Sequence, residues 1–329
     1  MASKGKREAS ETFLVVDEKY FSVLMELLDH AKKSVDVLAF SFGIGSAAGR
    51  YTESGAPFKI ARKLAELRKR GVSVRLYIEG FRETADRNRV TGEYLKKLGI
   101  KVKYGSTHAK GFCVDGRFVL FGSTNLTHQS IVKNNETNLL LADAAAVEGF
   151  QKYFEHLWKG GEHGGVVLPL PMIADGGFKD ELIELIDSAK SRLDFSIYFF
   201  HVTEIEKAFI RAHERGVHVR GFLHDHASFA LSYVRRTRGT AERMRAAGIG
   251  DLHYAPKNLF THSKYLIRDR REILLGTGNW LHEDIKVHPQ LYIRLTDPRL
   301  ARELSTHLGK QISGKLRRVD VDLDQTSWR

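Results

Sequence analysis

The sequence predicts an α/β protein made of two tandem repeats of about 155 residues each. Three pairs of segments, with one member of each pair in each half of the chain, match in residue type and in spacing. Within these segments, amphipathic helical patterns alternate with short apolar strand patterns. A stretch rich in glycine lies between the two sets. Each half is therefore expected to fold as one α/β unit.

The first two pairs each predict a helix followed by a strand. Residues 27–42 (LLDHAKKSVDVLAFSF) match residues 185–200 (LIDSAKSRLDFSIYFF), and both patterns change from an amphipathic helix to an apolar strand. Residues 63–78 (KLAELRKRGVSVRLYI) match residues 207–222 (KAFIRAHERGVHVRGF). In this second pair a glycine ends the helix before the strand begins.

The third pair predicts a β-hairpin in each half. Residues 107–125 (THAKGFCVDGRFVLFGSTN) match residues 261–279 (THSKYLIRDRREILLGTGN), and both contain two strand patterns around an Asp-Gly or Asp-Arg turn. The glycine-rich residues 159–177 between the halves predict a connector. We therefore divide the chain into a first half at residues 1–160, a linker at 161–177 and a second half at 178–329.

The overall composition is that of a folded globular protein. The chain is 42% hydrophobic and 28% charged with 6 prolines, which excludes a disordered or collagenous protein. Cys113 is the single cysteine, so an internal disulfide and a cysteine-rich zinc site are excluded, and we expect it to be a core residue. Residues 1–12 are polar and no run of about 18 apolar residues occurs, so we expect a cytoplasmic protein without a transmembrane segment.

The net charge points to a polyanionic partner. The chain has 52 lysines and arginines against 40 aspartates and glutamates, a formal charge of +12. Such an excess favours nucleic acid or an anionic lipid surface, and it does not choose between the two.

The two hairpin segments carry the candidate catalytic residues. Every matched pair is separated by 154 positions: His108, Lys110, Asp115, Gly122, Ser123 and Asn125 correspond to His262, Lys264, Asp269, Gly276, Thr277 and Asn279. Within each copy, His and Lys at positions i and i+2 of a strand point to the same face and can converge on one ligand.

This duplicated pattern resembles the HKD motif of the phospholipase D superfamily, which occurs twice per active site. The resemblance spans nearly the whole chain, because the flanking helices and strands repeat too. It implies two phospholipase D-like α/β repeats packed as a pseudo-twofold dimer with one shared active site at their interface. A monomer would then hold a complete site.

The resemblance also implies a metal-independent phosphodiesterase that needs no cofactor. One imidazole attacks phosphorus and forms a phosphohistidine, while the other, protonated, donates to the leaving oxygen. The two lysines, with Asn125 and Asn279, offset the charge on the non-bridging oxygens. Precedent in the superfamily favours His108 as the nucleophile and His262 as the acid.

The remaining motif residues are expected to support this chemistry. Asp115 and Asp269 fall at the predicted turns, where we expect them to fix the hairpin by bonding backbone amides. Ser123 and Thr277 are expected to support the site rather than react in it. Eleven residues after each Asn stand Glu136 and Gln290, which are candidate orienters of a catalytic histidine. The sequence leaves open whether Glu136 serves His108 in its own half or His262 across the interface.

A metal site is not expected. His224 and His226 form an H-x-H step after a predicted strand, but no third ligand is paired with them by spacing.

Arginine-rich segments follow the second strand of each half. In a parallel α/β sheet such connections gather at the edge where ligands bind. The candidate nucleic-acid contacts are Arg82, Arg87 and Arg89 in residues 81–90, and Arg235, Arg236 and Arg238 in residues 232–245. The nearby aromatic residues Tyr51, Phe58, Phe229 and Tyr233 are candidates to stack on unpaired bases.

The sequence thus predicts a phosphodiesterase that acts on nucleic acid, DNA or RNA. One alternative is a phospholipid hydrolase or phosphatidyltransferase, for which exposed apolar loops at the mouth of the site would be required. The other is a nucleic-acid-binding protein that keeps the fold without turnover, which the filled motifs oppose.

Overall fold

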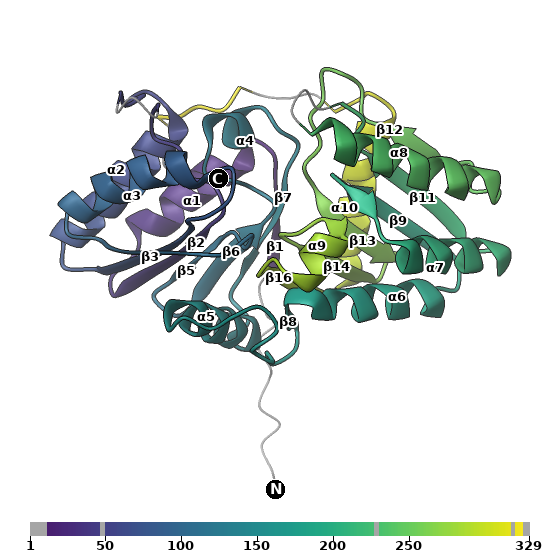
Figure 1. The fold of residues 1–329 in the computed structure, drawn as a ribbon, viewed down its shortest axis with the longest axis horizontal. Helices are drawn as coiled ribbons and strands as arrows, with labels where there is room; N and C mark the ends of the chain where they lie inside the picture. Colours follow the sequence, from purple (N-terminus) through teal and green to yellow (C-terminus); the bar gives the residue numbers. More distant parts are fainter. Residues whose placement is uncertain (1–11, 47–49, 227–229, 317–319, 325–329) are drawn as a thin grey trace, which may run out of the picture.

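Two seven-stranded sheets, one in each half of the chain, form the framework of the molecule (Figure 1). The computed structural model describes residues 12–46, 50–226, 230–316 and 320–324. The strand order is β1-β7-β6-β5-β2-β3-β4 in the first sheet and β8-β16-β14-β13-β9-β11-β12 in the second. Position by position the two orders are equivalent, which confirms the predicted duplication of one α/β unit.

The first half contains these elements: β1 (Thr12–Val16), α1 (Lys19–Asp29), β2 (Ser34–Ala39), α2 (Ala56–Lys69), β3 (Ser73–Glu79), α3 (Ala85–Lys97), β4 (Lys101–Gly105), β5 (Gly111–Val114), β6 (Phe118–Gly122), α4 (His128–Val132), β7 (Thr137–Leu141) and α5 (Ala144–Trp158). Strands β2, β3 and β4 are parallel, and β5, β6, β7 and β1 continue the sheet with antiparallel pairings.

The second half repeats that arrangement, with a small parallel sheet of β10 and β15 added. Its elements are β8 (Met172–Ala174), the 3₁₀ helix η1 (Asp175–Gly177), α6 (Phe178–Ser188), β9 (Arg192–Ile197), β10 (Phe200–His201), α7 (Thr203–Glu214), β11 (His218–Leu223), α8 (Leu231–Ala246), β12 (Leu252–Tyr254), β13 (Lys264–Arg268), β14 (Glu272–Gly276), β15 (Trp280–Leu281), α9 (His282–Lys286), β16 (Leu291–Thr296) and α10 (Pro298–Ile312).

The repeat extends to the caps of equivalent helices. Asp143 begins α5 by accepting a hydrogen bond from the backbone N–H of Ala146, and Asp297 begins α10 by accepting from Arg299 and Leu300. A carboxylate at this position satisfies N–H groups that the first helical turn leaves without partners. The two caps stand 154 residues apart, so the spacing of the motif also holds in the helices behind it.

The predicted linker is partly a strand. Residues 172–174 form β8, which pairs antiparallel with β16 at the edge of the second sheet. Glycine and proline around this segment indicated a connector, but Met172 and Ile173 are buried against the sheet. Tertiary packing of these two apolar side chains therefore overrides the local turn signal.

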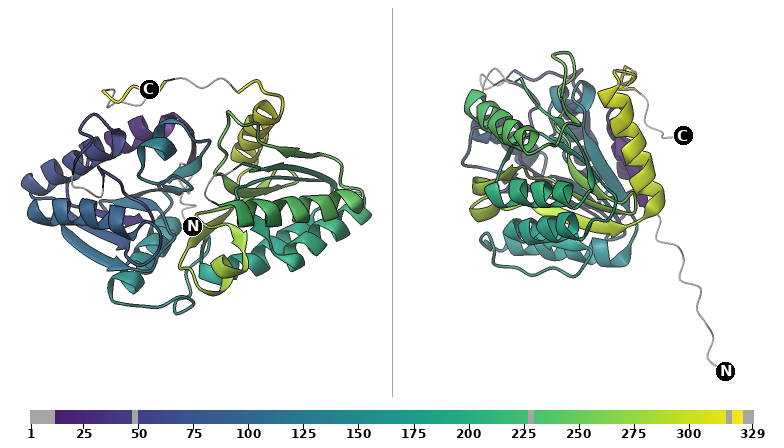
Figure 2. Two further views of the ribbon diagram at one scale, coloured as in Figure 1. Left: turned by 45° about the horizontal axis from the view of Figure 1, so that its top comes forward. Right: turned by 90° about the vertical axis from the view of Figure 1, so that its right-hand side faces the viewer.

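One shared core joins the two halves. It contains Phe150 of α5, Leu139 of β7 and Cys113 of β5, together with Leu291 of β16 and Leu304 of α10. Helix α5 contacts β8 of the second sheet, and α10 contacts β1 of the first (Figure 2). The last helix of each half therefore packs against the first strand of the other half, and the halves form a pseudo-twofold pair.

Candidate active site

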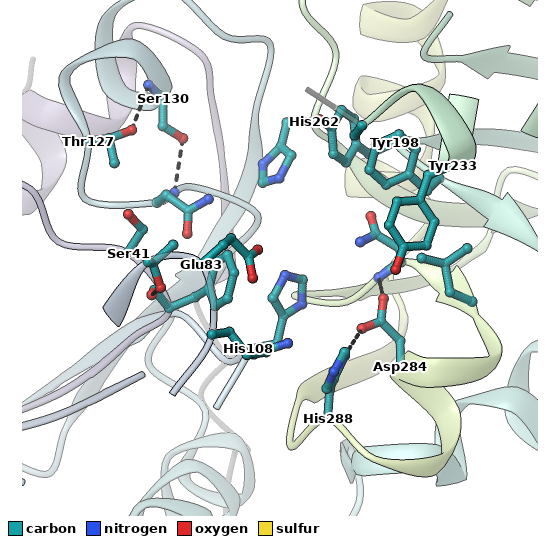
Figure 3. Close-up of a pocket in the computed structure, with 18 of the residues that line it drawn as sticks. Ser41, Glu83, His108, Thr127, Ser130, Tyr198, Tyr233, His262, Asp284 and His288 are labelled. Atoms are coloured by element: carbon teal, nitrogen blue, oxygen red, sulfur yellow. Dashed lines mark hydrogen bonds and ion pairs between the residues drawn. The ribbon is translucent and has the colours of Figure 1, made fainter. Parts of the chain in front are cut away.

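The two motif histidines meet where the halves join. The backbone N–H of His108 donates to the carbonyl of Pro289 over 2.7 Å, and that of His262 donates to the carbonyl of Asn135 over 2.8 Å. Each histidine is thus fixed by the loop that precedes the last strand of the opposite half. Both rings line one pocket of about 810 Å³, facing it from opposite walls (Figure 3).

The two lysines lie behind the histidines. Lys110 Nζ donates to the carbonyl of His108 over 2.5 Å, and Lys264 Nζ donates to the carbonyl of His262. Both side chains are buried, at 3% and 1% exposure. Burial lowers the pKa of Lys264 to about 7, and burial with the neighbouring charge of Lys264 holds the pKa of Lys110 well below its usual value. An anion in the pocket would favour the charged form of both.

Two asparagines, Asn125 and Asn279, line the pocket. The backbone N–H of Asn125 donates to Ser130 Oγ over 3.0 Å, and that of Asn279 donates to Asp284 Oδ2 over 2.8 Å. Both side chains line the pocket, and their Oδ1 atoms have no partner among the described residues. The amides are therefore available to a ligand.

Glu136 orients His262 across the interface. Its Oε2 accepts a hydrogen bond from His262 Nδ1 over 2.9 Å. Ser123 Oγ donates to the same oxygen over 2.5 Å, and Ser130 and Asn134 donate to Oε1. This answers the question that the sequence left open: Glu136 serves the histidine of the other half.

Gln290, the equivalent of Glu136, does not contact His108. Its Nε2 donates to the carbonyl of Asp284, and its Oε1 packs against Gly278 without a hydrogen-bond partner among the described residues. His108 Nδ1 also lacks a partner there. The two motif histidines therefore differ in their ring contacts: among the described residues, a carboxylate is bound to His262 and none is bound to His108.

Burial disfavours the charged form of both motif histidines. Burial lowers the pKa of His262 to about 4, against the opposing effect of Glu136, and burial with the charges of Lys110 and Arg82 holds the pKa of His108 well below its usual value. Burial alone would raise the pKa of Glu136, but His262 and Lys264 hold it below the ordinary value. When the His262 ring is neutral, a hydrogen bond to the Glu136 carboxylate fixes the proton on Nδ1 and leaves the Nε2 lone pair free.

Comparison with a family model finds a match in each half of the chain. A family model described as "Cardiolipin synthase, PLD-like domain" matches residues 24–158 and 182–312. The chain belongs to the phospholipase D-like family. The two matched segments correspond to the two halves, so the family unit occurs twice in this phospholipase D-like chain.

Relatives and solved structures agree with the family. The chain is 32% identical over 143 residues to the mitochondrial cardiolipin hydrolase of Xenopus tropicalis, covering 42% of this chain and 61% of the relative. It is 30% identical over 149 residues to the human mitochondrial cardiolipin hydrolase, covering 43% and 52%. The chain thus spans less than two thirds of the length of these relatives.

Two solved structures share the fold. The phosphatidylserine synthase of Haemophilus influenzae Rd KW20 matches with a TM-score of 0.70 at 14% identity, over 92% of this chain and 86% of that one. The polyphosphate kinase of Porphyromonas gingivalis matches with a TM-score of 0.67 at 14% identity, over 95% of this chain and 49% of that one. At this identity the likeness concerns the fold alone.

The four supporting residues do not line the pocket of this phospholipase D-like chain. Thr277 Oγ1 accepts from the backbone N–H of Leu291 over 3.1 Å, as Ser123 Oγ accepts from Thr137 over 2.9 Å. Asp115 accepts hydrogen bonds from Lys32, Lys33 and Ser34, and Asp269 accepts from the N–H groups of residues 190–192. The two aspartates therefore bind the connection that precedes β2 or β9, rather than the amides of their own hairpins.

The six candidate arginines do not form one groove. Arg82 and Arg87 line the pocket. Arg89 pairs with Asp86, Arg236 with Glu283 and Arg238 with Asp225, while Arg235 is exposed on α8. Of the four aromatic candidates, Tyr233 lines the pocket, Tyr51 packs on Phe58 and Tyr94, and Phe229 lies outside the described residues.

Sequence reasoning missed three groups of residues. Asp17 and Asp175, with φ of 51° and 52°, accept the backbone N–H groups of Glu136 and Gln290 over 2.9 and 3.0 Å. Ser130 and Asn134 hold the carboxylate of Glu136, and their equivalents, Asp284 and His288, form a hydrogen-bonded pair in the pocket. Ser130 and Asn134 stand 154 positions before Asp284 and His288, the spacing of the motif, whereas Asp17 and Asp175 are 158 positions apart.

The described part of the chain offers no group of three or more histidine, cysteine or acidic side chains placed to hold a metal ion. All four ring nitrogens of His224 and His226 lack a protein partner there, and the two rings lie 4.7 Å apart. Among the described helices, none has the length and apolar character needed to cross a bilayer.

Proposed function

We propose that this chain hydrolyses a phospholipid phosphodiester of the cardiolipin class through a phosphohistidine on His262. The observation that carries the chemistry is the pair of motif histidines in one pocket, one of them bound to a carboxylate. The relatives named cardiolipin hydrolase support the lipid substrate.

The tautomer supports His262 as the nucleophile, in place of the expected His108. A ring whose Nδ1 proton is held by Glu136 presents the Nε2 lone pair that attack on phosphorus requires. The same carboxylate stabilises the positive charge that the ring acquires once Nε2 bonds to phosphorus. His108 has no such carboxylate among the described residues.

The first step forms the phosphohistidine. His262 Nε2 bonds to phosphorus, the bond from phosphorus to the leaving oxygen breaks, and its electron pair goes to that oxygen. The leaving oxygen takes a proton from His108, whose charged form the bound phosphodiester anion favours. The proton on His262 Nδ1 stays on that nitrogen, hydrogen-bonded to Glu136. Asn125 and Asn279 and the two lysines offset the charge on the non-bridging oxygens. Water then releases the phosphoryl group from His262.

The surroundings of the pocket support a lipid. Its wall carries five aromatic side chains: Phe40, Tyr198, Phe199, Tyr233 and Phe260. Exposed apolar side chains adjoin pocket-lining residues on three separate segments, with Phe81 at 75%, Leu231 at 52% and Val287 at 59% exposure. Apolar side chains beside a basic surface suit an anionic bilayer. These are the exposed apolar loops that the sequence did not reveal.

A nuclease is the second candidate. The lining of the pocket by Arg82 and Arg87 and the formal charge of +12 favour it. A third candidate is a protein that binds nucleic acid without turnover. The complete motif in both halves argues against it.

One assay separates these functions. The purified chain in EDTA is offered vesicles containing cardiolipin, vesicles of phosphatidylcholine, single- and double-stranded DNA, RNA and bis-p-nitrophenyl phosphate. We expect cardiolipin to yield phosphatidic acid and phosphatidylglycerol, with activity that survives EDTA because side chains supply the cations. Cleavage of nucleic acid with intact lipid would establish the nuclease instead, and nucleic-acid binding without cleavage of any substrate would establish the binding protein.

A further inference from the structure

A second pair of carboxylate and imidazole lies in the same pocket. Asp284 Oδ1 accepts a hydrogen bond from His288 Nδ1 over 2.9 Å, and both residues line the pocket (Figure 3). The ring centre of His288 lies 6.5 Å from that of His108. Three imidazoles therefore line the pocket, and two of them are bound to carboxylates.

The internal repeat gives this pair two equivalent residues in the first half. Asp284 and His288 are the equivalents of Ser130 and Asn134, which hold the carboxylate of Glu136 in the first half. In the second half the carboxylate stands six positions earlier, at 284 in place of 290, and the residue at 288 is an imidazole. The positions that hold Glu136 in the first half thus carry a carboxylate and imidazole pair in the second half.

The geometry of His288 suits a base. Asp284 is buried, with 4% of its side chain exposed, and it accepts from Nδ1–H, so that Nε2 is the ring nitrogen left to act as a base. No described residue donates to that Nε2. The His288 side chain is 23% exposed, whereas His108 is buried at 6%. His288 is therefore the imidazole on the His108 side of the pocket that water reaches more readily.

We propose that His288, held by Asp284, is a further catalytic residue that deprotonates the water which hydrolyses the phosphohistidine. This rests on the proposed phosphohistidine at His262. The leaving group departs on the side of His108, opposite His262, and water must attack from there. Water oxygen bonds to phosphorus as His288 Nε2 takes its proton, and the bond from phosphorus to His262 breaks with its electron pair returning to Nε2. His108 serves as acid in the first step and His288 as base in the second.

The test is a burst experiment with bis-p-nitrophenyl phosphate and the full chain. His288→Ala is expected to release one equivalent of p-nitrophenol per site rapidly and then to turn over about 10²- to 10⁴-fold more slowly than the wild type. Intact mass should show the phosphoryl adduct accumulating. The retained burst itself establishes that the variant is folded.

His282→Ala is the matched control, because His282 begins helix α9, which ends just before His288, and does not line the pocket. It should keep the wild-type steady state. If burst and steady state fall together in His288→Ala, or if the steady state is unchanged, the role of His288 as base is wrong. If the wild type itself releases no p-nitrophenol and forms no adduct, the phosphohistidine mechanism fails instead.

Discussion

Glu136 and His262 form a 2.9 Å hydrogen bond although they belong to different halves of the chain. The carboxylate follows the first motif, and the imidazole belongs to the second. Neither half alone therefore contains an oriented nucleophile. The shared core that packs Leu139 and Phe150 with Leu291 and Leu304 brings the pair together, so packing of the halves is a condition for catalysis.

Glu136→Gln tests the charge of this contact. The amide oxygen still accepts from Nδ1 but cannot stabilise a cationic ring, so kcat for bis-p-nitrophenyl phosphate is expected to fall by about 10²- to 10³-fold. Glu283→Gln is the control, because Glu283 lines the same pocket and pairs with Arg236. Equal activity of Glu136→Gln and the wild type would show that the carboxylate only positions the ring.

The nucleophile is identified by comparing His262→Ala with His108→Ala on the same activated diester. p-Nitrophenolate needs little help from an acid, so His108→Ala should retain turnover and carry the phosphoryl adduct on His262 after rapid quenching. His262→Ala should show neither adduct nor turnover. Peptide mapping decides the site, and an adduct on His108 in His262→Ala would restore the assignment that the resemblance to the superfamily favours.

Local patterns were enough to predict the duplicated α/β unit, because each matched pair carries its own helix end, strand and turn. The same patterns predicted the two motifs, whose spacing depends only on one hairpin. They did not predict the Glu136 contact, since the packing of the halves decides which histidine the carboxylate meets. The pocket residues Asp284 and His288 were not predicted for a similar reason. Neither belongs to the motif, and only the fold brings them into the pocket with His108.

The lysines predict a pH dependence of anion binding. The pKa of Lys264, lowered by burial to about 7, means that its charged form is lost as pH rises through neutrality. Sulfate, whose charge is constant from pH 6 to 8, favours that form, so its dissociation constant should rise by up to about tenfold per pH unit above pH 7. The shift of Tm by sulfate is therefore expected to be larger at pH 6 than at pH 8.

Variants assign this effect to the site. Lys264→Ala and Lys110→Ala should each reduce the sulfate shift at pH 6 and remove most activity, because both ammonium groups act on one anion. His282→Ala should keep the wild-type shift. A sulfate shift in Lys264→Ala that matches the wild type at both pH values would place the bound anion elsewhere.

Asp115 predicts an acid-sensitive contribution to stability that is independent of catalysis. Burial alone would raise the pKa of its carboxyl, but the N–H groups of Ser34, Lys33 and Lys32 hold that pKa below the ordinary value. A carboxyl whose pKa is depressed by folding stabilises the native state above its unfolded pKa, and this contribution is lost as pH falls through the folded value. Asp115→Asn tolerates the positive φ of 55° but lacks the charge, so we expect it to lower the free energy of unfolding by about 1 kcal/mol at pH 7. Chemical denaturation at pH 7 and at about pH 3, below the ordinary Asp pKa, measures the difference, which should shrink in acid.

Asp269→Asn should behave in the same way, because Asp269 binds the amides of residues 190–192 as Asp115 binds those of residues 32–34. A destabilisation that is the same at both pH values would assign the effect to turn geometry rather than to the carboxylate.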